Sequence, residues 1–354
     1  MMRNIKNFVR TLGRSVPGGN SPDYARLVRN LYAGLLRREP EPGAVEQWAS
    51  KLEGGRDINE IIELFLASEE FNRLSRSENR LFVPPGHFYS PIVNVEEVRP
   101  QFDKAPPHPA ALPAIDLDGE RMLAQWKSLL PHLQDMPFPD QAAPGFRYCF
   151  QNPAFSYGDG SILSAMLRHF KPKRLVEVGS GYSSACAMDT IERYLDGRVE
   201  VGFVEPYPEL LIKLLGAETA ESVSIQACGV QHADLLTFTR LEAGDFLFID
   251  STHVMKTGSD VCHELFTVLP ALQSGVFVHF HDIFWPFEYG PEWVLQENRS
   301  WNELYGLRAF LMYNPAFEVV FFNDYFVRHY RDTVQADYPA MLKNSGGSIW
   351  LRKK

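Results

Sequence analysis

Short runs of β-branched and aromatic residues alternate with amphipathic stretches between residues 174 and 280, and this alternation limits the fold more than any other feature. Parallel strands need a long crossover, usually a helix, so the pattern predicts a parallel sheet with helices on both faces. We expect strands at 174–178, 199–204, 222–225, 245–250 and 276–280. We expect helices near 183–195, 207–215, 231–241 and 259–272.

Two further apolar runs follow at 317–322 and 348–351, with irregular sequence between them. They are typical of an antiparallel pair at the edge of a sheet. Helices near 117–132 and 160–170 precede the first strand. The fold class is therefore α/β, with a mostly parallel seven-stranded sheet and an antiparallel edge strand, in a domain that we place at 116–354.

The N-terminal part has a different organisation. Residues 1–20 indicate a flexible tail, residues 21–74 contain apolar residues at the three- and four-residue spacing of three short helices, and the proline-rich residues 75–115 indicate a linker. Within the helical part, Leu31-Tyr32, Phe65-Leu66 and Glu70-Phe71 resemble a domain of unknown function found in bacterial surface and glycan-related proteins. That resemblance implies a bacterial origin and a contact with protein or glycan through these helices.

Composition excludes several classes of function. Lysine and arginine total 35 against 44 acidic residues, and the net charge of −9 repels phosphate backbones, so we expect no nucleic-acid partner. No run approaches the ~18 apolar residues of a membrane span, so we expect no transmembrane segment. The four cysteines lie far apart without a C-x-x-C pair, as expected of reduced thiols in the cytoplasm.

A glycine pair lies where the first strand turns into the first helix. Gly179 and Gly181 would let a ligand approach the backbone, Tyr182 follows them as a further cofactor candidate, and Ser183 or Ser184 can cap a helix whose first amides face the ligand. Glu205 ends the next strand, where a ribose diol would be bound. A dinucleotide site prefers a third glycine, where this chain has Ser184, and Glu177 would repel a phosphate. An NAD-dependent oxidoreductase is therefore disfavoured.

Polar side chains follow two later strands at the points where those strands end. Asp250 and His253 follow the fourth strand, and His281 and Asp282 follow the fifth. The carboxyl ends of parallel strands line the ligand crevice, so these groups should converge beside the glycine pair. They could hold a divalent ion while a neutral histidine accepts a proton. We expect His279 to face away from His281 and to lie in the core.

The run Glu177-Val178-Gly179-Ser180-Gly181 resembles the first motif of class I S-adenosylmethionine-dependent methyltransferases, which have a Rossmann-like fold. The resemblance covers about residues 140–354 and implies S-adenosylmethionine as the cofactor. It implies that Glu177, Gly179 and Gly181 flank the amino acid part of the cofactor, that Glu205 binds the ribose, and that Gly229 lies at the adenine. It also implies that the segment before the first strand, with Tyr157 and Asp159, covers the cofactor.

The spacing Asp250-x-x-His253, followed by His281-Asp282, resembles the metal-dependent sugar O-methyltransferases of macrolide biosynthesis and bacterial methyltransferases associated with polysaccharide genes. That resemblance implies His253 as general base, with Asp250 and Asp282 as catalytic groups. It implies Mg²⁺ or another divalent metal on Asp250, His281 and Asp282. His281 stands where the family has a carboxylate, which weakens magnesium binding and leaves a softer metal or none.

These patterns together predict a cytoplasmic O-methyltransferase that acts on a hydroxyl, either of a sugar in a glycan or of a glycosylated small molecule. The alternative is a binding or scaffold protein whose methyltransferase-like domain has lost turnover. The aromatic run after the fifth strand, 284–293, could form an acceptor wall or a hydrophobic plug on the sheet. A homo-oligomer is compatible with the sequence.

Overall fold

The computed structural model describes residues 23–36, 38–73, 82–103 and 109–354. Its residues fall into two compact units, divided between Ser90 and Pro91. The predicted tail at 1–20 and parts of the predicted linker lie outside the described residues. The division falls inside the stretch that the sequence identifies as a linker.

Among the described residues, the smaller unit contains helices α2 (Tyr24–Leu31, continued by a π-helical turn at Tyr32–Leu36), α3 (Ala44–Glu53) and α4 (Ile58–Ala67). Asp23 and Asp57 cap α2 and α4, because each carboxylate accepts a hydrogen bond from a backbone N–H of the first turn. The apolar residues of the three helices form one core, in which the ring of Phe65 contacts the rings of Tyr32 and Trp48.

The described part of the larger unit contains one seven-stranded sheet in the order β3-β2-β1-β4-β5-β7-β6. The first five strands pair in parallel, and β7 is antiparallel to both β5 and β6. The predicted mixed sheet is confirmed, although the antiparallel strand is inserted next to the edge and β6 forms the edge itself. The strands are β1 (Arg174–Val178), β2 (Glu200–Val204), β3 (Ser224–Gln226), β4 (Phe246–Ile249), β5 (Phe277–Phe280), β6 (Phe317–Phe322) and β7 (Ile349–Lys353).

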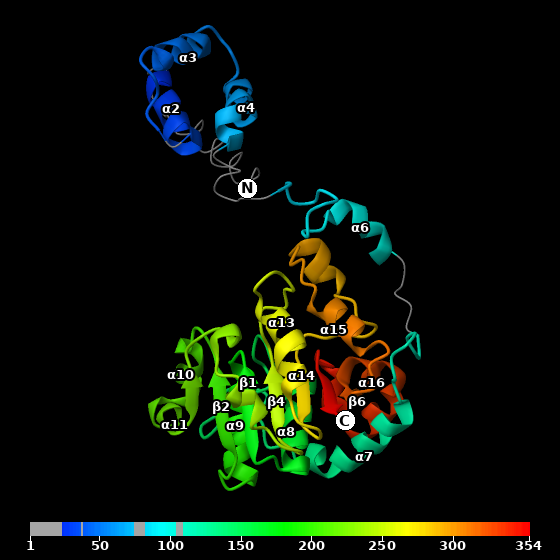
Figure 1. Cartoon of the computed structure of the whole chain (residues 1–354). Coiled ribbons are helices and arrows are strands. Elements are labelled where there is room, and N and C mark those ends of the chain that lie inside the picture. The colour runs from blue at the N-terminus through cyan, green and yellow to red at the C-terminus, as the bar shows by residue number, and fades with distance from the viewer. Residues whose placement is uncertain (1–22, 37, 74–81, 104–108) are drawn as a thin grey trace. The chain divides into compact units, whose positions relative to one another are not determined.

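Helices flank this sheet, and Figure 1 shows them around the labelled strands. Those before and among the parallel strands are α7 (Gly119–Gln134), α8 (Tyr157–Phe170), α9 (Tyr182–Tyr194), α10 (Glu209–Leu215), α11 (Ala217–Ser222), α12 (Leu236–Thr239), α13 (Asp260–His263) and α14 (Leu269–Ala271). Those that follow β5 are α15 (Glu303–Leu311), α16 (Asn323–His329) and α17 (Arg331–Asp337).

Two stretches that the sequence presents as irregular are helical in the structure. Residues between β6 and β7 form α16 and α17, whose periodicity is hidden because polar Asn323 and Asp324 are buried along with their apolar neighbours. Within the predicted linker, Val95–Phe102 forms helix α6, which begins at the capping residue Asn94 and contains Pro100. A proline inside a helix usually interrupts it, and Pro100 is accommodated here because it lies near the end of α6.

The register of the central strands sets the position of the functional site. Val178 of β1 lies opposite Ile249 of β4, and Ile249 lies opposite Phe280 of β5. The residues that follow these three are Gly179, Asp250 and His281, so they lie side by side where the strands end. Hydrogen bonds from the Asp250 N–H to Val178 and from the His281 N–H to Ile249 continue the ladder by one step.

Candidate active site

The two glycines of the first turn serve different purposes. Gly179 has a φ of +76°, and a Cβ there would lie 1.8 Å from the carbonyl oxygen of Asp250, so packing against the end of β4 requires glycine. At Gly181 a Cβ would meet only Leu210 Cδ2, at 3.9 Å. The surrounding side chains therefore leave room for a Cβ at Gly181, and its predicted contact with a ligand stays a prediction.

Glu177 lies beneath this turn and does not line open space. Its side chain is buried, and its Oε1 accepts a hydrogen bond of 2.5 Å from the Ser183 hydroxyl. Burial raises the pKa of the Glu177 carboxyl to about 8. The hydroxyl of Ser184 accepts from the Gly181 N–H, so both serines brace the start of α9, and Tyr182 is its first residue. Glu177 therefore supports the start of α9 through Ser183, and its role at the cofactor stays a prediction.

Glu205 follows β2, as the sequence predicts, and faces the glycine turn. Its Oε2 accepts from the Ser180 N–H and hydroxyl, and its Oε1 accepts from the Tyr207 N–H. A carboxylate at the end of β2 beside the N-terminus of α9 is placed to accept from a ribose diol. Gly229, the residue expected at the adenine, precedes a short helical turn after β3.

The two residues that we expected to cover the cofactor have other contacts. Asp159, in the first turn of α8, accepts a hydrogen bond from the Ser348 hydroxyl, and its Oδ2 lies 3.6 Å from Nε2 of His281. Tyr157 stacks on Phe150, and its hydroxyl accepts from Lys343 Nζ. These contacts connect Asp159 to His281 and Tyr157 to the segment before β7, and their role at the cofactor stays a prediction.

His253 is buried and has a carboxylate on each side of its ring. Its Nδ1 lies 2.7 Å from Oε2 of Glu303, and its Nε2 lies 3.4 Å from Asp250 and 3.5 Å from Asp282. Burial lowers the pKa of His253, but hydrogen bonds to Asp250 and Glu303 outweigh that effect and raise the pKa to about 10. The structure therefore brings His253, Asp250 and Asp282 together as predicted.

Glu303 is the main functional candidate that sequence reasoning missed. It is the first residue of α15, fifty positions after His253, and its side chain is almost completely buried. The backbone N–H of Glu303 and that of Asn302 both donate to the carbonyl oxygen of His253, so the contact joins the two segments at backbone and side chain. The only signal in the sequence is an acidic residue at the start of a helix, which is common at ordinary helix N-termini.

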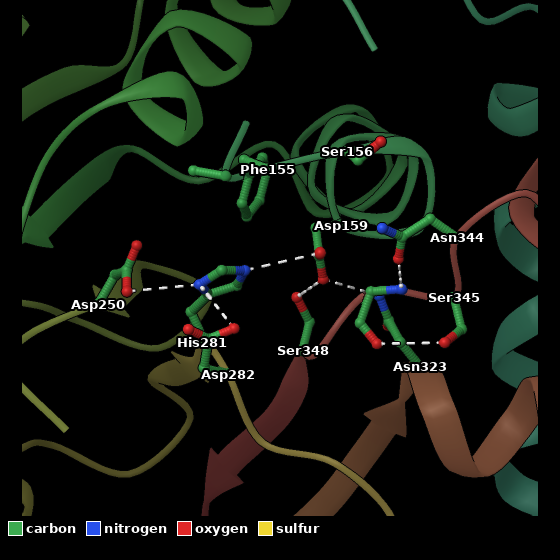
Figure 2. Close-up of polar contacts among 12 residues, drawn as sticks. Phe155, Ser156, Asp159, Asp250, His281, Asp282, Asn323, Asn344, Ser345 and Ser348 are labelled. Atoms are coloured by element: carbon green, nitrogen blue, oxygen red, sulfur yellow. Dashed lines mark hydrogen bonds and ion pairs between the residues drawn. The ribbon is translucent and has the colours of Figure 1, made fainter. Parts of the chain in front are cut away.

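His281 lies between three carboxylates, as Figure 2 shows. Its Nδ1 is 3.3 Å from Asp250 and 3.7 Å from Asp282, and its Nε2 is on the side of Asp159. Burial alone would lower the pKa of His281, but the charges of Asp282 and Asp250 raise it well above its usual value. The same contacts, against the effect of burial, hold the pKa of Asp250 well below its usual value.

This arrangement does not fit a divalent metal. Both ring nitrogens of His281 face carboxylates, whereas a metal ligand must present a lone pair to the ion. Within residues 23–36, 38–73, 82–103 and 109–354, no group of three or more His, Cys, Asp or Glu side chains is arranged to hold a metal ion. Nδ1 of His281 lies within ion-pair distance of both Asp250 and Asp282.

His279 is not on the opposite face from His281, and that expectation was wrong. Residues two apart in a strand point to the same face, and the two rings are stacked with their centroids 6.2 Å apart. His279 is buried as predicted, with its Nε2 at 2.8 Å from the Ser348 hydroxyl. Burial lowers the pKa of His279 well below its usual value, so this ring is neutral.

Two residues of the site have a strained backbone conformation. His253 and Asp282 have φ values of 61° and 57°, in the left-handed region that residues other than glycine rarely adopt. Such residues persist where the surrounding structure holds them, and they are frequent at active sites. The two strained residues face each other across the gap between Nε2 of His253 and Oδ2 of Asp282.

The aromatic run after β5 divides between the two roles that the sequence left open. Trp285 and Phe287 are buried and pack on Phe322 of β6, so they form a hydrophobic plug. Trp293 instead lines a pocket, together with Trp301. The ring of Trp301 contacts the ring of His253, with centroids 4.4 Å apart.

Comparison with known proteins agrees with these features. A family described as a methyltransferase domain matches residues 176–283, and a domain of unknown function (DUF4214) matches residues 18–75. An uncharacterised protein of Archaeoglobus fulgidus is 31% identical over 175 residues, which are 48% of this chain and 77% of that protein.

Solved structures of methyltransferases are also similar to the chain. The methyltransferase PaMTH1 of Podospora anserina, bound to SAH, shares 18% identity at a TM-score of 0.36, over 69% of this chain and 100% of that one. The O-methyltransferase TomG of Streptomyces achromogenes, in complex with SAM, shares 15% identity at a TM-score of 0.37, over 68% of this chain and 92% of that one.

Proposed function

We propose that this chain, which belongs to the class I S-adenosylmethionine-dependent methyltransferases, transfers a methyl group to a hydroxyl, and that the hydroxyl is on a sugar of a glycan or of a glycosylated small molecule. The observation that carries the O-methyl assignment is the contact of 2.7 Å between Nδ1 of His253 and the buried carboxylate of Glu303. The sugar assignment follows from the resemblance of the Asp250 to Asp282 pattern to sugar O-methyltransferases.

The cofactor fits the glycine turn. When bound, S-adenosylmethionine supplies an electrophilic methyl group on a positively charged sulfur. Gly181 provides room for a ligand against the backbone, because no atom of the chain lies nearer than 3.9 Å to the position of a Cβ there. Glu205 would hold the ribose, and Asp250, beside Gly179, places a negative charge where the sulfur cation would lie.

His253 would act as the general base. Donation of the Nδ1 proton to Glu303 selects the tautomer in which Nε2 carries the lone pair, as in other acid–histidine pairs. Nε2 would then take the proton of the acceptor hydroxyl, and Glu303, Asp250 and Asp282 would stabilise the resulting cation. Because the base must be neutral and its pKa is raised to about 10, we expect methyl transfer to rise with pH through the neutral range.

The first experiment is calorimetric titration of the full chain with S-adenosylmethionine, which needs no knowledge of the acceptor. We expect saturable binding to one site. If a folded sample does not bind at millimolar ligand, the proposal fails and the scaffold alternative is favoured.

The second experiment measures methyl transfer to sugar acceptors by His253→Ala and by the wild type in excess EDTA. General base catalysis contributes about 10²–10⁴-fold, so we expect a loss of that size in the variant. We expect full activity in EDTA. An unchanged rate in His253→Ala would show that His253 is not the base. Loss of activity in EDTA that a divalent ion reverses would show that a metal takes part in the reaction.

A further inference from the structure

The larger unit contains a pocket of about 210 Å³ to which no ligand has been assigned above. Its walls come from two stretches, residues 91–102 and residues 288–305. Drug-sized ligands occupy sites of about 300–1,000 Å³, so this pocket has room for a single ring with its substituents.

The pocket adjoins the proposed base through three consecutive residues. Trp301 lines the pocket and contacts the ring of His253. Asn302 lines the pocket as well, and its backbone N–H donates to the carbonyl oxygen of His253. Glu303 contacts Nδ1 of the same histidine. A ligand in the pocket is therefore separated from His253 by one indole ring.

One wall of the pocket is helix α6, in the stretch that precedes the methyltransferase domain. Val98 and Phe102 of α6 line it, and Gln101 is beside them. The backbone N–H of Val93 donates to the Ser300 hydroxyl at 3.3 Å, which ties the segment to the opposite wall. A stretch that acted only as a spacer would need neither the tie nor the apolar residues.

The lining combines aromatic surfaces with hydrogen-bonding edges. Trp293, Trp301 and Tyr305 supply the aromatic surface, and the Arg299 guanidinium lies over both indoles at 4.1 and 4.5 Å from the ring centroids. Glu288 accepts a hydrogen bond from the Tyr305 hydroxyl. A six-membered sugar has an apolar C–H face that packs on aromatic rings and a belt of hydroxyls that each donate and accept. The carboxylate, amide and guanidinium groups here offer both kinds of partner.

We propose that this pocket is an acceptor subsite of the methyltransferase that binds one pyranose ring next to the ring that reacts, because Trp301 separates the pocket from His253. Helix α6 then forms a specificity-determining wall of this subsite. This inference rests on the proposed function for the reaction, but the binding of a sugar to the pocket can be measured without turnover. The linking segment then has a second role, because it completes a substrate site.

The test measures binding of methyl β-D-glucopyranoside and methyl α-L-rhamnopyranoside to the full chain by saturation-transfer NMR, with indole and adenosine as non-sugar probes. Tyr305→Ala and Phe102→Ala remove one aromatic side chain from each wall. Their matched controls are Tyr313→Ala and Phe88→Ala, since both residues are exposed and neither lines the pocket. Affinity for S-adenosylmethionine and the circular dichroism spectrum are recorded for every variant.

We expect at least one glycoside to bind, both pocket variants to weaken that binding by about tenfold, and both controls to bind as the wild type does. The proposal is overturned if no glycoside binds, if the pocket variants bind it normally, or if only indole or adenosine depends on the pocket. S-adenosylmethionine affinity is expected to be equal in all five proteins. If the wild type does not bind S-adenosylmethionine, the proposed function is overturned. The glycoside titration would still show whether the pocket binds a sugar.

Discussion

At the scale of single residues, the same amino acid can be needed at two positions of one motif for different physical reasons. Gly179 is required by the carbonyl of Asp250, whereas a Cβ at Gly181 would make only an ordinary contact with Leu210, although the two glycines are equivalent in the sequence pattern. Glu177 matches the motif in type and spacing but is buried against Ser183. A sequence states which residue is present, and only its neighbours in space decide what constrains it.

The glycine pair gives a direct test of that difference. We expect Gly179→Ala to lower the free energy of unfolding by about 3 kcal/mol, because a Cβ would strike backbone at a positive φ. Gly181→Ala should change stability by less than about 1 kcal/mol and weaken S-adenosylmethionine binding by about tenfold or more. Urea denaturation and calorimetric titration measure the two effects. Normal cofactor affinity in Gly181→Ala would contradict the assigned contact.

The buried carboxyl of Glu177 predicts a pH dependence of stability. Its pKa is about 8 in the folded chain against 4.5 for the free group, so the folded state binds the extra proton between these values. The stability that it contributes is therefore complete below pH 4.5 and is lost as the pH rises through 8. Urea denaturation measures the free energy of unfolding of Glu177→Gln and of the wild type. Relative to the wild type, we expect that of Glu177→Gln to rise by a few kcal/mol between pH 5 and pH 9, at about 1.4 kcal/mol per pKa unit.

The exposed Glu218→Gln is the control for that series, and it should follow the wild type at every pH. Parallel stability curves for Glu177→Gln and the wild type would mean that Glu177 is ionised in the folded chain.

At the scale of elements, strand ends were predictable, and the contacts between elements distant in sequence were not. The ends of β4 and β5 were expected within one residue, because apolar runs stop abruptly at Asp250 and His281. Parallel strands bring such ends together, so the cluster of His253, Asp250 and Asp282 followed from pattern alone. Helix α15 places Glu303 against His253 across fifty residues, and helix α6 forms a pocket wall from a proline-containing stretch. Contacts between elements so distant in sequence depend on packing.

The position of α15 predicts the effect of changing Glu303. We expect Glu303→Gln to lower kcat by about 100-fold or more and to leave the acceptor KM and cofactor affinity nearly unchanged, because an amide cannot enforce the histidine tautomer. Steady-state kinetics with a sugar acceptor measure the split. Glu292→Gln, at an exposed position in the preceding helical turn, is the control. A rise in the acceptor KM as large as the fall in kcat would indicate that Glu303 supports substrate binding instead.

At the scale of the whole molecule, the chain consists of two units with separate cores. The core of the smaller unit and the core around the sheet share no residue. Among the described residues, every helix is too short or too polar to span a membrane.

Separate cores predict separate unfolding. We expect Phe65→Ala to destabilise the helical unit by about 3–5 kcal/mol, since it removes a buried ring that contacts Tyr32 and Trp48. In calorimetry, one transition should shift or disappear while the second transition and S-adenosylmethionine binding stay unchanged. Leu64→Ala is the control, because Leu64 is the exposed neighbour. A common shift of both transitions would show that the two units unfold as one.

The sequence by itself determined the strands of the parallel half, the glycine turn and the polar strand ends, because these depend on local periodicity and on the polarity of residues that follow apolar runs. The tertiary structure decided that His281 lies among three carboxylates, that His279 shares its face, and that Glu303 contacts His253. These features depend on distances between side chains of different elements. Such distances are set by packing of the whole domain, which no local pattern encodes.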